Sequence, residues 1–497
     1  MTLSGSPHGG SLSLLTDLYQ LTMACAYWRE GIAEREAVFS LSFRSNPFGG
    51  GFSIACGVAR VVGFLTGLRF DESDLAFLQG LKGADNKPLL DEGFLNRLRD
   101  FEFRCDLDGI PEGTAVFPHE PLLRVQGPLW QAQLLETAML NILNFETLIA
   151  TKAARIALAA QGDPVLEFGL RRAQGVDGGL AASRAAYIGG CAGTSNVLAG
   201  KLFGIPVKGT HAHSWVMAFA SEAESFEAYA GAMPNNSIFL VDTYDTITGV
   251  QRAIEAGRKL RARGYQLTGI RLDSGDLLEL SVSARRLLDE AGFRDAVIVG
   301  SGDLDEYAIA DWKRRGAKIG VWGVGTRLVT GYDDPALNGV YKLSAIRDSA
   351  GAWQYKLKLS EQADKMSDPG ILQVRRFQRE GKPIADVVFD ELAPPPRKWT
   401  LIEPGDFSRR VAVPGDALGE DLLAPLFRGG QPVYEPPAAQ QARQRALDQV
   451  RLLDERFTRL REPEVYPAGL EEGLWTLKQE TAARLRQAES NRQGESK

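Results

Sequence analysis

The stretch TGIRLDSGD, residues 268–276, decides the fold that the chain is expected to adopt. A short apolar run ends abruptly in Asp273, Ser274 and Gly275, as a buried strand does where it meets a polar loop. The apolar residues that follow Asp276 keep the three-four spacing of a helix that buries one stripe: Leu277, Leu280, Ala284, Leu287 and Leu288. The stretch therefore predicts one strand–loop–helix unit.

The same unit recurs on either side of this stretch. Apolar runs that end in polar or glycine residues lie at 238–241, 296–299 and 318–322. Each begins about 20–30 residues after the last, which is the length of one strand with its helix. Residues 165–168 and 203–207 extend the series, and 192–196 resembles a further strand end. Six or seven such strands predict an α/β barrel, in which the carboxyl ends of the strands carry the chemistry.

The flanking segments show a different pattern. A helix is expected from Leu14 to Trp28, strands near 38–43 and within 105–125, and buried helices within 131–160. Strands return at 340–343 and 355–358, and a helix with one apolar stripe is expected over 442–461. The last ten or so residues are polar, so we expect them to be disordered.

Composition excludes several classes of protein. A chain of 497 residues is too long for one compact core, so two or three domains are expected. The net charge of −6, without long basic runs, argues against a nucleic-acid or membrane-binding surface. No signal peptide or run of roughly 20 apolar residues is present, so we expect a cytoplasmic protein. The four cysteines form no CxxC pair or zinc spacing, which indicates reduced thiols: Cys25, Cys56, Cys105 and Cys191.

The stretch GTHAHSW, residues 209–215, holds two of the four histidines in the chain. Imidazole titrates near neutral pH, so a histidine at a strand end can be a base, a metal ligand, a phosphoryl acceptor or a structural residue. A zinc or two-metal hydrolase site is disfavoured, because such barrels need histidines on later strands and none follows His213.

Two glycine-rich strand ends suggest a bound phosphate. Residues 300–302 and 323–326 offer backbone N–H groups and hydroxyls to such a group. The chain has neither a P-loop nor a complete dinucleotide fingerprint. Together with the carboxylates at the strand ends and two arginines near Phe168, these stretches suggest a phosphorylated substrate bound with Mg²⁺. A charge such as that of Arg271, set within an apolar strand, also needs a partner or a ligand, whereas Asp276 is expected only to cap a helix.

Several separated motifs make this sequence similar to the nicotinate phosphoribosyltransferase family over nearly its whole length. In chain order they are LLTDLYQLTM from Leu14, SNPFGGG from Ser45, EGTAVFPHEPLLRV from Glu112, QLLETAMLNILN from Gln133, EFGLRRAQGVDGG from Glu167, GTHAHSW from Gly209, RLDSGDL from Arg271 and GVGTRLVT from Gly323. Unrelated chains do not share so many motifs in the same order by chance.

The resemblance implies a reaction and a fold. In the reaction, nicotinate, phosphoribosyl pyrophosphate, ATP and water give nicotinate mononucleotide, pyrophosphate, ADP and phosphate, the first step of NAD synthesis from nicotinate. Mg²⁺ as cofactor, ATP as co-substrate and a homodimer are implied with it. The implied fold is an irregular α/β barrel of the type II phosphoribosyltransferase kind, with an α+β domain built from N- and C-terminal segments. The expected domains are the α+β domain over 1–150, the catalytic barrel over 151–335, a C-terminal segment packing on both over 336–485 and a disordered tail over 486–497.

The resemblance also implies roles at the phosphate end of the site. His213 matches the histidine that takes a phosphoryl group from ATP, and neutral imidazole is a suitable nucleophile for this step. Asp273 is expected to contact the ribose hydroxyls or Mg²⁺ and its waters, and Arg271 to contact substrate charge. His211 is given a supporting or structural role. The expected phosphate site consists of Arg271, Asp273, Ser301, Gly302, Gly323, Gly325 and Thr326.

At the pyridine end, Tyr19 and Phe168 match the family's pair of stacking aromatics. Arg171 matches an arginine that pairs with the carboxylate, and Thr210 can donate a hydroxyl hydrogen bond. In the family Tyr19 reaches the neighbouring subunit's site. In the related nicotinamide enzyme an aspartate accepts from the amide, and the aligned position here is Ser195. Because a buried carboxylate would repel nicotinate, an uncharged residue favours the acid.

Other functions stay open on the sequence alone. The nearest is nicotinamide phosphoribosyltransferase, which uses the same machinery on the amide. A catalytically silent homologue kept for binding is another, and a metal-dependent barrel hydrolase comes third. A quinolinate enzyme is disfavoured, because that relative is much shorter and lacks the histidine linked to ATP.

Overall fold

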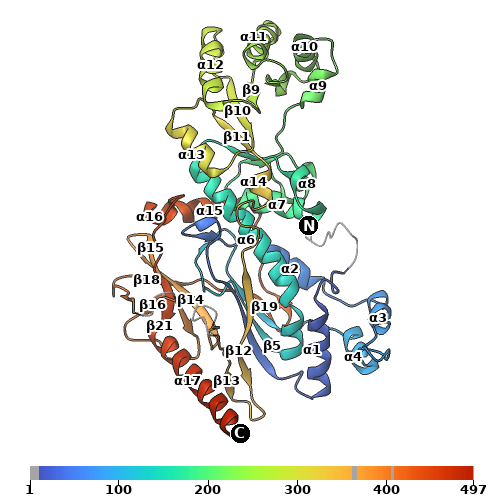
Figure 1. Ribbon diagram of the computed structural model, residues 1–497, viewed down its shortest axis with the longest axis vertical. Helices are drawn as coiled ribbons and strands as arrows, with labels where there is room; N and C mark the ends of the chain where they lie inside the picture. The colour runs from blue at the N-terminus through green and yellow to red at the C-terminus, as the bar shows by residue number, and fades with distance from the viewer. Residues whose placement is uncertain (1–10, 361–365, 405–407, 496–497) are drawn as a thin grey trace. The chain divides into compact units, whose positions relative to one another are not determined.

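The computed structural model describes residues 11–360, 366–404 and 408–495 of the chain (Figure 1). The chain divides into two compact units. The composite unit comprises residues 1–148, 336–437 and 448–497, and the barrel unit comprises residues 149–335 and 438–447. One unit thus combines both ends of the chain, and the other is built almost entirely from its middle.

The barrel unit contains one parallel sheet and the helices that connect its strands. Its strands are β6 (Val165–Glu167), β7 (Gly193–Thr194), β8 (Ile238–Leu240), β9 (Gly269–Leu272), β10 (Val297–Gly302) and β11 (Val321–Val324). Its helices are α7 (Gly175–Ile188), α8 (Val197–Phe203), α9 (His213–Met217), α10 (Glu222–Ala232), α11 (Thr246–Ala262), α12 (Leu277–Glu290), α13 (Glu306–Arg314) and α14 (Thr326–Val329). Figure 1 shows α10, α11 and α12 outside the strands of this unit. The helix predicted after Asp276 is α12, and Asp276 caps it by accepting from the Leu278 and Glu279 N–H groups.

The strand order shows how the parallel sheet is arranged. Across the sheet the strands lie in the order β7-β6-β11-β10-β9-β8, so the first strand of the unit, β6, pairs with its last, β11. This is the cyclic order of a barrel in which neighbours in the chain are neighbours in space. A parallel bridge from Thr194 to Val207 adds the next position beyond β7. The predicted mixed α/β fold with a parallel sheet is therefore confirmed.

The gap between the Val207 segment and β8 is spanned by a side chain. Leu240, on β8, turns its N–H away from β9 and donates it to Nε2 of His211 over 3.3 Å. The imidazole thus accepts a hydrogen bond that a neighbouring strand would otherwise accept. His211 is buried, and its ring lies against those of Phe226, Tyr229 and Phe239. This burial lowers the pKa of His211 below its ordinary value, which favours the neutral ring.

Two of the expected strands differ in the structure, one because it does not form and the other because it is shifted. Residues 203–207 were expected to end a buried strand, but Phe203 is the last residue of α8. Gly204, at φ +68°, ends that helix in the left-handed region, and only Val207 makes a bridge. The strand expected at 318–322 is shifted toward the C-terminus as β11, because Gly323 and Val324 still pair with β10.

The composite unit contains two larger sheets and a small one. Its strands are β1 (Glu36–Phe43), β2 (Ser53–Ile54), β3 (Asp106–Gly109), β4 (Ala115–Val116), β5 (Leu123–Pro128), β12 (Gly339–Arg347), β13 (Trp353–Tyr355), β14 (Leu372–Arg379), β15 (Lys382–Asp390), β16 (Thr400–Ile402), β17 (Arg410–Ala412), β18 (Leu418–Asp421), β19 (Ala424–Arg428), β20 (Gln431–Pro432) and β21 (Ala468–Glu471). Its helices are α1 (Leu18–Arg29), α2 (Val58–Thr66), α3 (Glu72–Gln79), α4 (Glu92–Arg99), α5 (Leu129–Leu134), α16 (Glu455–Thr458) and α17 (Glu472–Glu495), while α6 (Glu136–Ala159) and α15 (Ala439–Leu452) cross between units.

The first sheet joins the two ends of the chain directly. Its order is β13-β12-β1-β5-β3-β19-β20, so β1 lies between β12 from the C-terminal half and β5 from the N-terminal half. Apolar side chains of β1, including Phe39, Leu41 and Phe43, belong to the main core of this unit. An α+β unit made from N- and C-terminal segments is therefore confirmed as part of the fold class.

The ends of three expected elements differ from the prediction. The N-terminal helix begins at Leu18, after the Asp17 cap position, and not at Leu14. The helix expected over 442–461 is two helices, α15 and α16, because Asp454 interrupts the first and caps the second. The polar tail expected to be disordered from 486 is helical up to Glu495, as the end of α17, and the last two residues lie outside the described residues. Among the described helices, none has the length and hydropathy needed to cross a membrane.

Candidate active site

Arg271 organises the carboxyl ends of the barrel strands. It lies on β9 with 13% of its side chain exposed. Its guanidinium donates from Nε to Ser301 Oγ over 2.7 Å, from Nη2 to Asp273 Oδ1 over 2.7 Å and from Nη1 to Thr210 Oγ1 over 3.4 Å. Three neighbouring segments of the barrel are therefore joined through one rigid, charged fork.

Asp273 is held as a carboxylate by these neighbours. Burial alone would raise the pKa of Asp273, but the hydrogen bond from Ser301 and the positive charge of Arg271 hold this pKa below its usual range. Its second oxygen, Oδ2, lies 3.9 Å from Nε2 of His213. An ionised carboxylate therefore faces the imidazole across the rim.

Asp242 is a member of this site that the sequence reasoning did not select. Its Oδ2 accepts the Asp273 N–H over 3.0 Å and the Ser274 hydroxyl over 2.6 Å, which fixes the loop after β9. Its Oδ1 is buried without a hydrogen-bond partner among the described residues. The signal was available, because Asp242 directly follows the apolar run 238–241 just as Asp273 follows β9.

His213 points toward this group, whereas His211 points away from it. Ala212 between them is extended, at φ −103° and ψ 168°, and α9 begins at His213. The two imidazoles have separate partners, because Nε2 of His211 accepts the Leu240 N–H. Nδ1 of His213 lies 3.1 Å from the Thr243 hydroxyl, and 41% of the His213 side chain is exposed. The supporting or structural role expected of His211 and the phosphoryl-acceptor role expected of His213 stay predictions.

Phe168 and Gly323 form the wall beside Arg271. The guanidinium carbon of Arg271 lies 5.6 Å from the centre of the Phe168 ring. A Cβ on Gly323 would lie 2.8 Å from Cδ2 of that ring and 3.3 Å from the Ser301 Cβ. Gly323 was selected as a phosphate contact, but what the structure shows is a residue that leaves room for the aromatic ring.

A Gly323→Ala variant is expected to displace the Phe168 ring, since such a close contact is too short for the ring to stay in place. We expect KM for the substrate that binds beside this ring to rise roughly tenfold, because the ring loses its position beside Arg271. Steady-state kinetics measure this, and Gly320→Ala is the control, because no atom lies within 4 Å of a Cβ there. Equal KM values for the two variants would contradict the assignment.

The remaining predicted residues of this unit lie near the same strand ends. Gly302 ends β10 at φ +121°, and a Cβ there would lie 2.9 Å from the Asp273 carbonyl oxygen, so glycine is required. Gly325 precedes α14, which begins at Thr326. Arg171 is exposed on a short 3₁₀ turn, Leu170–Arg172, and Ser195 is half-buried just after β7.

Tyr19 belongs to the composite unit. It lies on α1 with 47% of its surface exposed. Burial raises its pKa above the ordinary value, and Glu136 and Asp17 act in the same direction. Its predicted stacking on the pyridine ring stays a prediction.

The composite unit also carries a basic pocket that the sequence reasoning did not identify. It has a volume of about 710 Å³ and lies between β12, β13 and α17. No ion pair is found for its four cationic side chains within the described part of the chain. The lining includes two aromatic residues and these cations: Trp353, Tyr355, Lys342, Lys356, Lys358 and Arg484. Such a pocket suits an anionic ligand.

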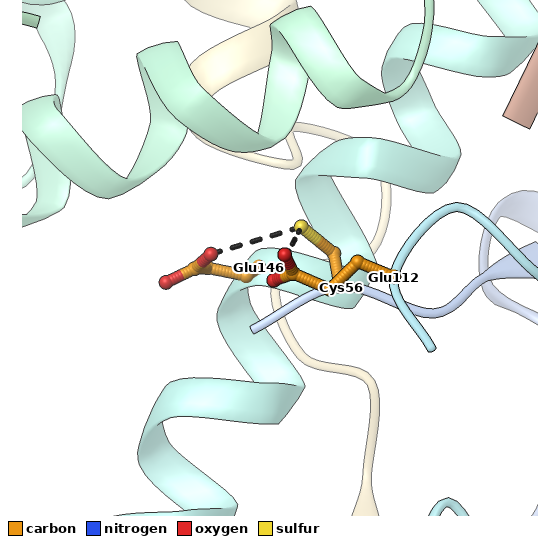
Figure 2. A group of neighbouring side chains, drawn as sticks. All are labelled: Cys56, Glu112 and Glu146. Atoms are coloured by element: carbon orange, nitrogen blue, oxygen red, sulfur yellow. Dashed lines mark hydrogen bonds between the residues drawn. The ribbon is translucent and has the colours of Figure 1, made fainter. Parts of the chain in front are cut away.

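A second polar cluster in the composite unit is better explained as structure. Figure 2 shows Cys56, Glu112 and Glu146 converging, with the Cys56 sulfur 4.0 Å from Glu112 Oε1 and 3.7 Å from Glu146 Oε2. Glu112 accepts the Gly57 N–H over 2.8 Å, and Glu146 pairs with Arg60 over 3.1 Å. Because each carboxylate already has a protein donor, we assign these side chains no metal.

The barrel and its rim together define the class of protein. Parallel strands in barrel order bring an arginine, two aspartates, a histidine and glycine-rich turns to one edge. The chain shares this arrangement, the type II phosphoribosyltransferase fold, with the solved structures compared below.

Comparison with known proteins specifies the family. Three family models match: the nicotinate phosphoribosyltransferase N-terminal domain at residues 14–144, the nicotinate phosphoribosyltransferase family at 165–347 and its C-terminal domain at 373–478. Nicotinate phosphoribosyltransferase of Bacillus subtilis (strain 168) is 42% identical over 476 residues, covering 94% of each chain. The Homo sapiens enzyme is 35% identical, covering 93% of this chain and 95% of its own. The chain therefore belongs to the nicotinate phosphoribosyltransferase family.

Solved structures agree with this assignment. The crystal structure of human nicotinic acid phosphoribosyltransferase superposes with a TM-score of 0.80 at 33% identity, covering 94% of this chain and 99% of that one. Nicotinate-nucleotide pyrophosphorylase from Pyrococcus furiosus superposes with a TM-score of 0.66 at 23% identity, covering 89% and 95%. At that identity the second match supports the fold alone.

Proposed function

We propose that this chain catalyses the ATP-coupled transfer of phosphoribose from phosphoribosyl pyrophosphate to nicotinate. Membership of the family supports the reaction. The relatives named nicotinate phosphoribosyltransferase align with this chain over nearly their whole length. The observation that carries the proposal is the joining of Arg271, Asp273, Ser301 and His213 at one rim of the barrel. Cations and carboxylates held there suit a substrate that bears both phosphate and sugar hydroxyls.

The pyridine substrate would lie beside Phe168. In this proposal the ring stacks between Phe168 of one subunit and Tyr19 of its neighbour, and Arg171 or Arg271 pairs with the carboxylate. Thr210 would donate a hydrogen bond. Because Ser195 is uncharged, it would not repel the carboxylate of nicotinate, as an aspartate at this position would.

The phosphoribosyl end would lie over the glycine-rich turns. Ser301, Gly302, Gly325 and Thr326 offer backbone and hydroxyl groups to phosphate, and Gly323 keeps the space between them and Phe168. The transition state of this transfer develops positive charge on the ribose and negative charge on the departing pyrophosphate. Asp273 would contact the ribose hydroxyls, and Arg271 would stabilise the charge of the substrate.

His213 would accept the γ-phosphoryl group of ATP. Its ring is accessible at the rim, and its two nitrogens lie near Thr243 and Asp273. Nucleophilic attack by a ring nitrogen on phosphorus forms a phosphoramidate and releases ADP. Hydrolysis of that N–P bond returns free histidine and phosphate. The added charge on the ring would reorganise the contacts of Arg271 and Asp273.

The residues at this rim fit Mg²⁺. The unpartnered, buried Oδ1 of Asp242 and the Oδ2 of Asp273 are the hard oxygen donors that this ion prefers. Bound there with substrate phosphates, the ion would neutralise part of their negative charge.

A homodimer would complete the site. Exposed apolar side chains on α8 and beside it support a protein contact there: Val197, Leu198, Leu202 and Val207. In this proposal Tyr19 stacks in the site of the neighbouring subunit, and the enzyme works in the cytoplasm.

One assay tests the proposed substrate. Pyrophosphate release is measured with nicotinate or nicotinamide, with and without ATP. We expect kcat/KM for nicotinate to exceed that for nicotinamide roughly a hundredfold, and ATP to stimulate the reaction. A reversed preference would identify a nicotinamide enzyme, and binding of nicotinate without turnover would identify a silent homologue.

A further inference from the structure

Glu167 is a fully buried carboxylate at the end of β6, directly before Phe168. Three donors from three segments converge on it. The Gly169 N–H donates to its Oε1, and the hydroxyls of Ser183 and Thr194 donate to its Oε2, over 2.8 Å and 2.5 Å. Ser183 lies on α7 and Thr194 on β7, so one side chain ties together the turn after Phe168, a helix and the neighbouring strand.

The direction of these hydrogen bonds is fixed by Asn196. Its backbone N–H donates to Thr194 Oγ1 over 2.9 Å, and its side-chain Nδ2 donates to Ser183 Oγ over 3.1 Å. Because both hydroxyls already accept from Asn196, their protons point outward, and that of Thr194 points to Glu167. The Gly179 carbonyl oxygen, 2.9 Å from Ser183 Oγ, competes for the proton of that residue alone.

A carboxylate suits this position because it only accepts hydrogen bonds. In a glutamine at 167 the amide NH₂ would face either the Gly169 N–H or the Thr194 hydroxyl proton. Either arrangement leaves a donor opposite a donor in a site without water access, since Glu167, Ser183 and Thr194 are all buried. A neutral isostere therefore cannot preserve the network.

The segments that Glu167 joins are those that hold the proposed pyridine contacts. Gly169 begins the turn from Phe168 to Arg171, and Ser195 lies between Thr194 and Asn196. The Ser195 N–H also donates to the backbone carbonyl of Glu167 over 2.9 Å. We propose that Glu167 is a positioning residue for the pyridine acid, which sets the placement of Phe168, Arg171 and Ser195 without touching the substrate. This inference rests on the nicotinate contacts proposed above.

Kinetics of the full-length enzyme test this inference with Thr194→Val, Thr194→Ser and Glu167→Gln. Valine keeps the shape of threonine and removes the hydroxyl. We expect Thr194→Val to raise KM for nicotinate about tenfold while kcat stays within about threefold, because the acid is misplaced and the phosphoribosyl end is not. The preference for nicotinate over nicotinamide should fall with it. Thr194→Ser should restore the wild-type KM, and Glu167→Gln should have the larger effect.

Glu222→Gln is the matched control, because Glu222 is buried in the same unit and pairs with Arg252 away from this network. It should keep the wild-type KM. If Glu167→Gln does not fold, the threonine pair decides alone. A folded Thr194→Val enzyme with wild-type KM, or equal losses in the serine and valine variants, would overturn the inference.

Failure of the proposed nicotinate site would look different. Phe168→Ala and Arg171→Ala probe the contacts themselves. Wild-type KM in both would remove the site on which the inference rests. A raised KM in both, with an unaffected Thr194→Val, would remove the role of Glu167 alone.

Discussion

A His213→Ala enzyme is expected to lose acid-labile phosphate incorporation from γ-labelled ATP and with it the stimulation of nicotinate mononucleotide synthesis by ATP. The reason is that His213 presents an accessible imidazole beside Asp273, whereas His211 is buried against aromatic rings. Without a nitrogen nucleophile the phosphoramidate has no site to form. ATP hydrolysed per nucleotide formed should fall toward zero.

His211→Gln is the contrasting variant. Because Nε2 of His211 accepts the Leu240 N–H, its loss should lower the melting temperature and leave phosphate incorporation measurable. Labelling of the His213→Ala protein at the wild-type level would show that another residue takes the phosphoryl group. Labelling lost only from His211→Gln would exchange the two roles.

Arg271→Ala is expected to lower kcat/KM for nucleotide synthesis about a thousandfold. The substitution removes the partner of Asp273, Ser301 and Thr210 at once, together with the cation beside Phe168. Removing one preorganised charged group from an active site costs roughly a hundredfold to a thousandfold in rate. The pKa of Asp273 should also rise, because the charge of Arg271 helps to hold it down. The acid limb of the pH profile then moves to higher pH.

Arg271→Lys distinguishes charge from geometry. An ammonium keeps the charge but cannot reach three acceptors as a planar fork, so we expect a loss of about a hundredfold. Arg285→Ala is the control: this arginine of the same unit donates to the Phe293 and Ala296 carbonyls, which precede β10. It should lower the melting temperature and spare kcat/KM. A wild-type value for Arg271→Ala would contradict the role of the rim.

The barrel could be predicted because buried parallel strands leave a periodic trace in the sequence. Each apolar run ends where polar side chains begin, and parallel strands place those ends on one edge. The ends of strands were harder to predict where a glycine occurs, because glycine can either end an element or lie within a strand. Gly204 ends a helix, whereas Gly323 continues β11 by pairing with Ser301, and the Phe168 ring occupies the space where a Cβ would lie. A single sequence does not distinguish a turn glycine from a packing glycine.

The candidate site was predicted in part. The residues that would face substrate carry chemically distinctive side chains, and Arg271, Asp273, Ser301 and Thr210 do converge. Glu167 and Asp242 were not selected, because their importance comes from backbone and hydroxyl donors supplied by other segments. Such partners are defined only when the strands are side by side.

The imidazole that spans the gap between Val207 and β8 has a mechanical consequence. The strands β6, β11, β10 and β9 are joined to one another by backbone hydrogen bonds along several residues. The segment leading to the proposed phosphoryl acceptor pairs with β7 through the backbone of Thr194, but it is joined to β8 by the side chain of His211. Beside the proposed phosphoryl acceptor, the connection between neighbouring barrel segments therefore depends on one imidazole, whose loss would leave the Leu240 N–H without its acceptor.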